Sequence, residues 1–151
     1  MSYSLDVNLL LYASDRSSER YENASKFLAS CAEGPELFYL AWPTLMSYLR
    51  IATHPSIFSA PLSPKEAFEN VNALLSMPHV RAVSELDGFT AAYEQVTEGV
   101  VVRGNLVPDA HLATILFQHG IRTLYSSDRD FRKFATLEVR DPFTSSTLSD
   151  R

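Results

Sequence analysis

Four aspartates stand at points of the sequence where a carboxylate can do chemistry. Asp6 follows a short apolar segment, and Asp109 lies at the start of a predicted helix. Asp128 and Asp130 follow a second apolar segment. Each has an ordinary explanation, because an aspartate near a helix N-terminus caps the helix or complements its dipole. Asp6 fits that explanation less well, since its neighbours are apolar on both sides and carboxylates are rarely buried alone.

Together, these aspartates indicate a site for a divalent cation. Carboxylates that converge from distant parts of a chain repel one another, and a bound cation removes the repulsion. Oxygen ligands without His or Cys pairs favour Mg²⁺ or Mn²⁺ over zinc. The histidines show no helical metal-site spacing and are expected at the surface or the core edge. Such a site can activate water for the cleavage of a phosphodiester bond.

Alternating helix and strand patterns predict the fold that gathers the aspartates. We expect strands over 3–6, 36–40, 79–83, 121–127 and 137–143, and helices over 7–13, 18–31, 41–55, 63–77, 87–98 and 108–119. Strands separated by helices of this length pair in parallel, with helices on both faces. The predicted class is α/β, a three-layer α/β/α sandwich with a short parallel central sheet. Ligands of such sheets bind beyond the carboxyl ends of the strands, where the aspartates fall.

Two helix boundaries carry specific local signals. The segment S-P-K-E predicts a capping box between Ser63 and Glu66 at the start of the helix over 63–77. Gly120 is typical of the position that ends a helix, and it follows the predicted helix that contains Asp109.

Composition narrows the class of protein. The 151 residues, 46% of them hydrophobic, predict one globular domain over 1–143 and a tail over 144–151. No apolar run reaches the roughly 18 residues of a membrane span, and the first residues lack signal-peptide features, so we expect a cytoplasmic protein without a membrane partner. The single cysteine, Cys31, permits no internal disulfide. The net charge of −5 argues against broad attraction to nucleic acid but permits a local basic rim.

Three segments resemble the PIN domain, and specifically the VapC-type ribonuclease toxins of bacterial toxin–antitoxin pairs. They are YSLDVNLLLYA, RGNLVPDAHLA and LYSSDRDFRKF, and WPTLMSYLRIATHP is typical of one branch of the family. The resemblance spans 5–143 and implies a metal-dependent endoribonuclease that uses Mg²⁺ or Mn²⁺ to activate water. It also implies a cognate antitoxin, an RNA substrate and a homodimer, and the apolar helices over 42–51 and 63–77 favour the homodimer as well.

The resemblance assigns roles to particular residues. Asp6 matches the first family acid, Asp109 the acid of the D-A-x-x-A helix, and Asp128 the acid of the T/S-x-D-x-D-F segment, so these three are the expected metal ligands. Asp130 matches the more variable acid of that segment, and all four are candidate catalytic residues. Ser47 departs from the family, because M-S-Y-L-R places it where a glutamate is usual. Either the site works with three or four aspartates, or the protein is an attenuated PIN domain that acts mainly as a binding partner.

Basic residues in the motif segments are candidates for phosphate contact. Arg103 and Arg129 are the candidate RNA-binding residues. Arg50, Arg132 and Lys133 are weaker candidates, and the alternative for all five is an ordinary solvated surface.

Two other classes of protein share an aspartate after a first strand. A phosphatase of the haloacid dehalogenase type needs a second aspartate two residues later, where this chain has Asn8, and a later lysine after a suitable strand. A receiver domain needs an acidic pair at the first strand and a lysine after the last strand. Neither pattern is present, so the sequence favours the PIN domain over both classes.

Overall fold

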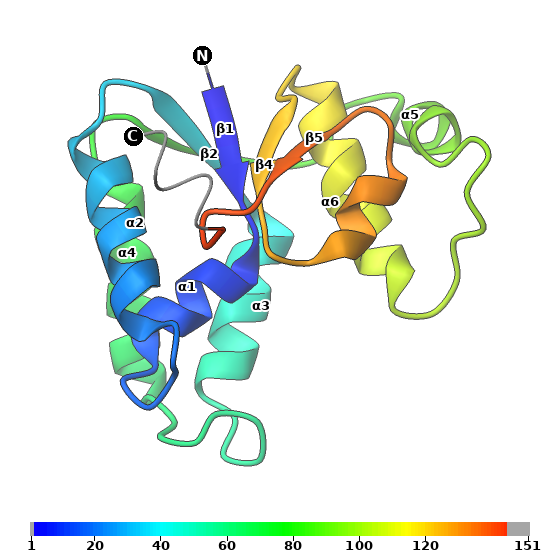
Figure 1. The fold of residues 1–151 in the computed structure, drawn as a ribbon. Helices are drawn as coiled ribbons and strands as arrows, with labels where there is room; N and C mark the ends of the chain where they lie inside the picture. The colour runs from blue at the N-terminus through cyan, green and yellow to red at the C-terminus, as the bar shows by residue number, and fades with distance from the viewer. Residues whose placement is uncertain (1, 145–151) are drawn as a thin grey trace.

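Five short parallel strands form the centre of the computed structural model, which describes residues 2–144 (Figure 1). The strands are β1 (Ser2–Leu5), β2 (Leu37–Ala41), β3 (Val80–Val83), β4 (Thr123–Tyr125) and β5 (Glu138–Arg140). Their order across the sheet is β3-β2-β1-β4-β5, and each neighbouring pair is parallel. The chain therefore starts in the middle of the sheet, extends it on one side, and returns to complete the other. This arrangement places the end of β1 beside the end of β4.

Helices cover both faces of the sheet, which confirms the predicted three-layer α/β/α sandwich (Figure 1). They are α1 (Val7–Ser14), α2 (Tyr21–Glu33), α3 (Trp42–Ala52), α4 (Pro64–Leu75), α5 (Phe89–Val96), α6 (Leu106–Gln118) and the 3-10 helix η1 (Arg129–Lys133). One hydrophobic cluster joins β1 and β2 to α1, α3 and α4, and a second joins β4 and β5 to α6 and η1.

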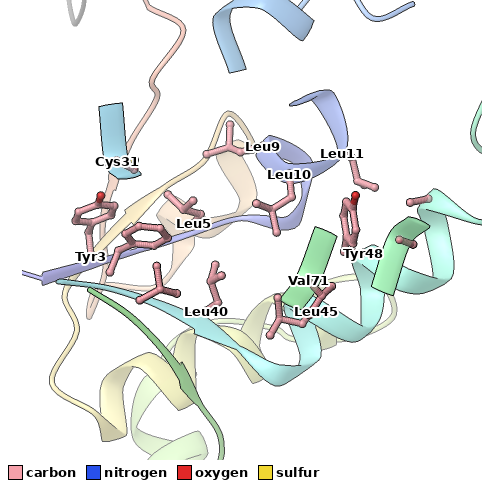
Figure 2. Packing of buried hydrophobic residues seen from close by; sticks show 14 of the residues in the cluster. Tyr3, Leu5, Leu9, Leu10, Leu11, Cys31, Leu40, Leu45, Tyr48 and Val71 are labelled. Atoms are coloured by element: carbon pink, nitrogen blue, oxygen red, sulfur yellow. The ribbon is translucent and has the colours of Figure 1, made fainter. Parts of the chain in front are cut away.

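The first hydrophobic cluster holds α1 rigidly against the sheet. Figure 2 shows Leu5 and Leu40, from neighbouring strands, packed among Leu10 of α1 and Leu45 and Tyr48 of α3. All five side chains are at most 2% exposed, so small displacements would cost packing energy. Because the apolar residues on both sides of Asp6 belong to this core, the position of the Asp6 backbone is fixed by packing.

Local sequence signals set most helix boundaries. The predicted capping box is confirmed, because Ser63 Oγ accepts from the Glu66 N–H at 3.1 Å and Glu66 Oε1 accepts from the Ser63 N–H at 3.0 Å. Gly120 follows α6 with a φ of 71°, a left-handed conformation that suits glycine.

Several elements differ in length from the prediction. Helix α6 begins at Leu106, earlier than predicted, because the first four N–H groups of a helix have no intrahelical acceptor and Pro108 therefore costs no hydrogen bond there. The helix predicted over 87–98 is confined to Phe89–Val96, after Gly88 with a φ of 79°. Strand β4 is only three residues long and pairs with Tyr3–Leu5 of β1, so Ser126 lies just beyond the ladder rather than in it.

No helix among residues 2–144 is long and apolar enough to cross a membrane. The predicted tail lies outside the described residues beyond Thr144.

Candidate active site

The carboxyl ends of β1 and β4 form the base of the site. Leu5 is the partner of Tyr125 in the parallel ladder, and the Asp6 N–H donates to the Tyr125 carbonyl at 3.0 Å. Parallel strands that end together present the residues that follow them at the same edge of the sheet. Asp6 and Ser126 are those residues, and they come from positions 120 residues apart.

Three of the four predicted acids lie close enough together to share one cation. Asp109, Asp128 and Asp130 can each present a carboxylate oxygen within 4.8 Å of the other two, the one such group of three or more His, Cys, Asp or Glu side chains in the described part of the chain. Asp109 comes from the first turn of α6, and Asp128 and Asp130 come from the start of η1. The Asp130 N–H donates to Asp128 Oδ1 at 2.9 Å. That bond is a local cap, so Asp128 combines a structural role with its place in the acidic group.

Asp6 lies outside this group of three but adjoins it electrostatically. The side chain is buried, with 5% exposure. Burial raises the pKa of Asp6, the hydrogen bond from Ser126 lowers it, and the charge of Asp128 raises it again. A buried carboxylate that also feels a like charge is unfavourable in its ionised form. A nearby cation would remove that penalty.

Ser126 connects Asp6 to the acidic group, and it was not singled out from the sequence. Its hydroxyl donates to Asp6 Oδ2 at 2.8 Å and accepts the Asp128 N–H at 3.0 Å. Asn8 Nδ2 approaches the same Asp6 oxygen at 3.4 Å. Ser126 is the T/S of the T/S-x-D-x-D-F segment, so the signal was present in the motif. The serine is 1% exposed, and its hydroxyl holds the Asp6 carboxylate and the Asp128 backbone together.

The pKa of Asp109 shows most clearly that negative charge is concentrated at this site. Its pKa is raised from 3.8 to about 7, first by burial and then by the charges of Asp128, Asp6 and Asp130, while Lys133 opposes the rise. Repulsion from three directions places all four aspartates in one electrostatic unit. The donor set is all carboxylate oxygen, which is the set that hard cations such as Mg²⁺ and Mn²⁺ prefer. The residues present therefore fit a divalent metal ion of this kind.

Ser47 lies in the helix that follows the second strand, as the family match expects. It is partly buried in α3, which directly follows β2, the neighbour of β1. A serine at this position carries no negative charge. The acidic group consequently rests on the aspartates alone.

The candidate phosphate-binding residues are exposed. Arg103 lies before α6, and Arg129 stands between Asp128 and Asp130 at the start of η1. Lys133 Nζ is 3.4 Å from Asp130 Oδ1, so one basic side chain already touches the acidic group. Arg50 and Arg132 are exposed as well.

The histidines make contacts away from the four aspartates of the site. His111 contacts Glu85 at 2.6 Å, and His79 and His119 contact the backbone carbonyls of Cys31 and Ser84. Among residues 2–144 the one group of three or more potential metal ligands therefore consists of carboxylates.

Comparison with known proteins identifies relatives along nearly the whole chain. The sequence is 46% identical over 144 residues to ribonuclease VapC48 of Mycobacterium tuberculosis, a match that covers 95% of this chain and 99% of that protein. It is 30% identical over 143 residues to VapC ribonuclease Mb2897 of Mycobacterium bovis, covering 95% and 97% of the two chains. No protein-family model matches the sequence.

Solved structures of low sequence identity share the fold. VapBC-1 from nontypeable Haemophilus influenzae superposes with a TM-score of 0.65 at 15% identity, covering 95% of this chain and 100% of that one. The M. tuberculosis toxin VapC20, described as cleaving the sarcin-ricin loop, superposes with a TM-score of 0.63 at 16% identity, covering 90% and 98%. The solved structures show the shared fold, and the two relatives of 46% and 30% identity assign the family: this chain belongs to the VapC ribonucleases, the PIN-domain toxins of toxin–antitoxin pairs.

Proposed function

We propose that this protein is a toxin whose aspartates bind Mg²⁺ or Mn²⁺, and that the protein uses this metal to cleave RNA phosphodiester bonds. The observation that supports the proposal most strongly is the meeting of Asp109, Asp128 and Asp130 beside the buried Asp6. Four carboxylates gathered beyond the ends of β1 and β4 are costly in their ionised form without a cation. The ribonuclease relatives match 95% of this chain, which favours an active enzyme over an attenuated PIN domain.

The proposed roles of the residues follow from their surroundings. Asp109 and Asp128 hold the metal from within the group of three, and Asp6, which matches the first family acid, joins them as a ligand from its buried position beside that group. Asp130, which is exposed and paired with Lys133, completes the negative rim. When bound, the metal supplies an activated water and stabilises negative charge on the phosphate. Ser126 holds Asp6 by its hydroxyl and holds the Asp128 backbone by accepting its N–H. The packed core behind α1 keeps Asp6 from moving away when the other acids are charged.

The proposed protein partners are a cognate antitoxin and a second copy of the chain. Structures similar in fold include a VapBC complex from Rickettsia felis bound to promoter DNA. Trp42 and Met46 of α3 are 41% and 49% exposed, and Phe68 of α4 is 56% exposed. Exposed apolar groups of this size favour burial against another protein, and two-fold symmetry is the commonest arrangement of a homodimer. We place the activity in the cytoplasm, where the RNA and the antitoxin would meet the toxin.

Cleavage of RNA with and without metal tests this proposal. Purified wild-type protein should cleave total bacterial RNA in the presence of Mn²⁺ or Mg²⁺ and leave it intact in EDTA. The Asp109→Asn variant should be inactive in both, while Asp87→Asn, an exposed aspartate outside the site, should cleave like the wild type. Cleavage in EDTA, or full activity of Asp109→Asn in Mn²⁺, would refute the proposal.

A further inference from the structure

An arginine outside the acidic motifs reaches the edge of the site. Arg20 lies immediately before α2, and its Nη1 donates to Ser127 Oγ at 3.0 Å across 107 residues of sequence. Ser127 sits between Ser126, which binds Asp6, and Asp128. The hydrogen bond thus ties the guanidinium to the residue that precedes Asp128, although nothing in the local sequence around Arg20 marks it as functional.

Two aromatic rings hold the guanidinium in place. The Arg20 Cζ lies 5.4 Å from the centroid of the Tyr12 ring and 5.0 Å from that of Phe143. The two rings contact each other edge to face, with centroids 5.9 Å apart. Cation–π contacts of this kind attract a guanidinium and restrict its motion. An exposed arginine is ordinarily mobile, whereas this one is restrained in one position before any ligand arrives.

The restrained guanidinium retains binding capacity. Arginine carries five N–H donors in a planar fork, and the contacts in residues 2–144 use one of them, for Ser127. The side chain is exposed, so the remaining donors are open to solvent. A planar fork of this kind matches the two oxygens of a phosphate.

An RNA substrate would need a positive group near this negatively charged site. RNA brings negative phosphates to a site that already contains four carboxylates, and a metal that neutralises the carboxylates does not neutralise the neighbouring phosphates. Lys133 is paired with Asp130 on the η1 side of the acids. Arg20 contacts Ser127 from the segment between α1 and α2, so it is a second cation held to the segment that carries Asp128, and among the described residues it is not paired with an acid there.

We propose that Arg20 is a substrate-binding residue that holds an RNA phosphate adjacent to the one being cleaved. This inference rests on the proposed ribonuclease function and adds a contact outside the motif segments. A rival role is purely structural, in which Arg20 only ties Tyr12 and Phe143 to the loop after β4. The two roles differ in what they predict for RNA affinity and for its dependence on salt.

The matched variants are Arg20→Gln, Arg20→Lys and Arg16→Gln. Arg16 is an exposed arginine of the same loop, so Arg16→Gln changes the net charge equally without removing the contact to Ser127. The probe is a fluorescently labelled single-stranded RNA of mixed sequence, with binding measured by anisotropy in EDTA at several salt concentrations. Cleavage of the same RNA in Mn²⁺ is measured alongside, as is the melting temperature of each variant.

We expect Arg20→Gln to bind the RNA about tenfold more weakly at low salt and to reduce the slope of log K against log salt by about 0.7, the loss of one phosphate contact to a single strand. Arg20→Lys should keep the slope, because the charge remains, but raise KM more than it lowers kcat. Arg16→Gln should bind within twofold of the wild type.

RNA binding by Arg20→Gln that matches wild type or Arg16→Gln would overturn the inference. If Arg20→Gln does not fold, Arg20→Lys carries the test, and an unchanged KM would overturn the inference in the same way. Failure of the wild type to cleave RNA with any divalent metal would instead count against the proposed function itself.

Discussion

Removing the charge of Asp109 should stabilise the metal-free protein, although the same change should abolish its activity. Burial and three neighbouring aspartates raise the pKa of Asp109 from 3.8 to about 7. The folded state therefore binds a proton more tightly than the unfolded state does. Between these pH values the folded protein carries more protons, so stability falls as the pH rises from about 4 to about 7. Above pH 7 the full cost of the ionised carboxylate is present.

The size of the effect follows from the pKa. A rise from 3.8 to about 7 is equivalent to about 4 kcal/mol, at about 1.36 kcal/mol for each pH unit. Asp109 is only partly buried, and solvent screens its interactions with the other acids. We therefore expect Asp109→Asn to raise the free energy of unfolding by about 1–2 kcal/mol at pH 8, which corresponds to roughly 2–8 °C in melting temperature for a domain of this size.

Urea unfolding in EDTA at pH 8 and pH 4.5 measures this difference. The gain of Asp109→Asn over the wild type should shrink to well under half at pH 4.5, because Asp109 is then largely protonated in the folded state. Asp87→Asn is the control, since Asp87 is exposed and outside the acidic group, and it should change stability by less than about 0.5 kcal/mol at either pH. Saturating Mn²⁺ should reverse the order, because the wild type then gains more from the metal. An Asp109→Asn variant that is no more stable than wild type at pH 8 would refute the proposed charge repulsion.

Two further substitutions test the residues around the acids. Ser126→Ala should lower the free energy of unfolding by about 1–3 kcal/mol, because it leaves Asp6 and the Asp128 N–H without the shared hydroxyl, and RNA cleavage should drop at least tenfold. Ser126→Thr should restore both stability and cleavage, and equal behaviour of the Ala and Thr variants would argue against a hydrogen-bonding role. Ser47→Glu should lower the Mg²⁺ concentration for half-maximal cleavage about tenfold or more, because one added carboxylate strengthens cation binding; an unchanged metal requirement would mean that Ser47 does not face the metal.

The features of this site that depend on neighbouring residues could be predicted from the sequence, whereas few of the contacts between distant segments could. The order of helices and strands, the Ser63–Glu66 capping box and the places of Asp6 and Asp128 after their strands all depend on neighbouring residues. The start of α6 was less predictable, because proline is tolerated in the first turn and does not mark which helical position it occupies.

The contacts that join distant segments were beyond sequence reasoning. The bond from Ser126 to Asp6 requires the register of β1 against β4, in which Leu5 pairs with Tyr125. The spacing of residues along the chain does not predict that register. Arg20 is a stronger case, because its hydrogen bond to Ser127 and its contacts with Tyr12 and Phe143 come from three separate regions. Only the packed fold brings these groups together.

Binding of Mn²⁺ to the purified protein, followed by calorimetry at pH 7, tests the metal centre most directly. The wild type should bind Mn²⁺ saturably and release protons as it does so, because a cation favours the ionised form of Asp109, whose pKa is raised to about 7 without it. Asp109→Asn and Asp128→Asn should each lose most of the affinity, while Asp87→Asn should keep it. Wild-type protein that binds no Mn²⁺ at millimolar concentration, or that binds it equally well after either substitution, would contradict the assignment of these aspartates as a metal site.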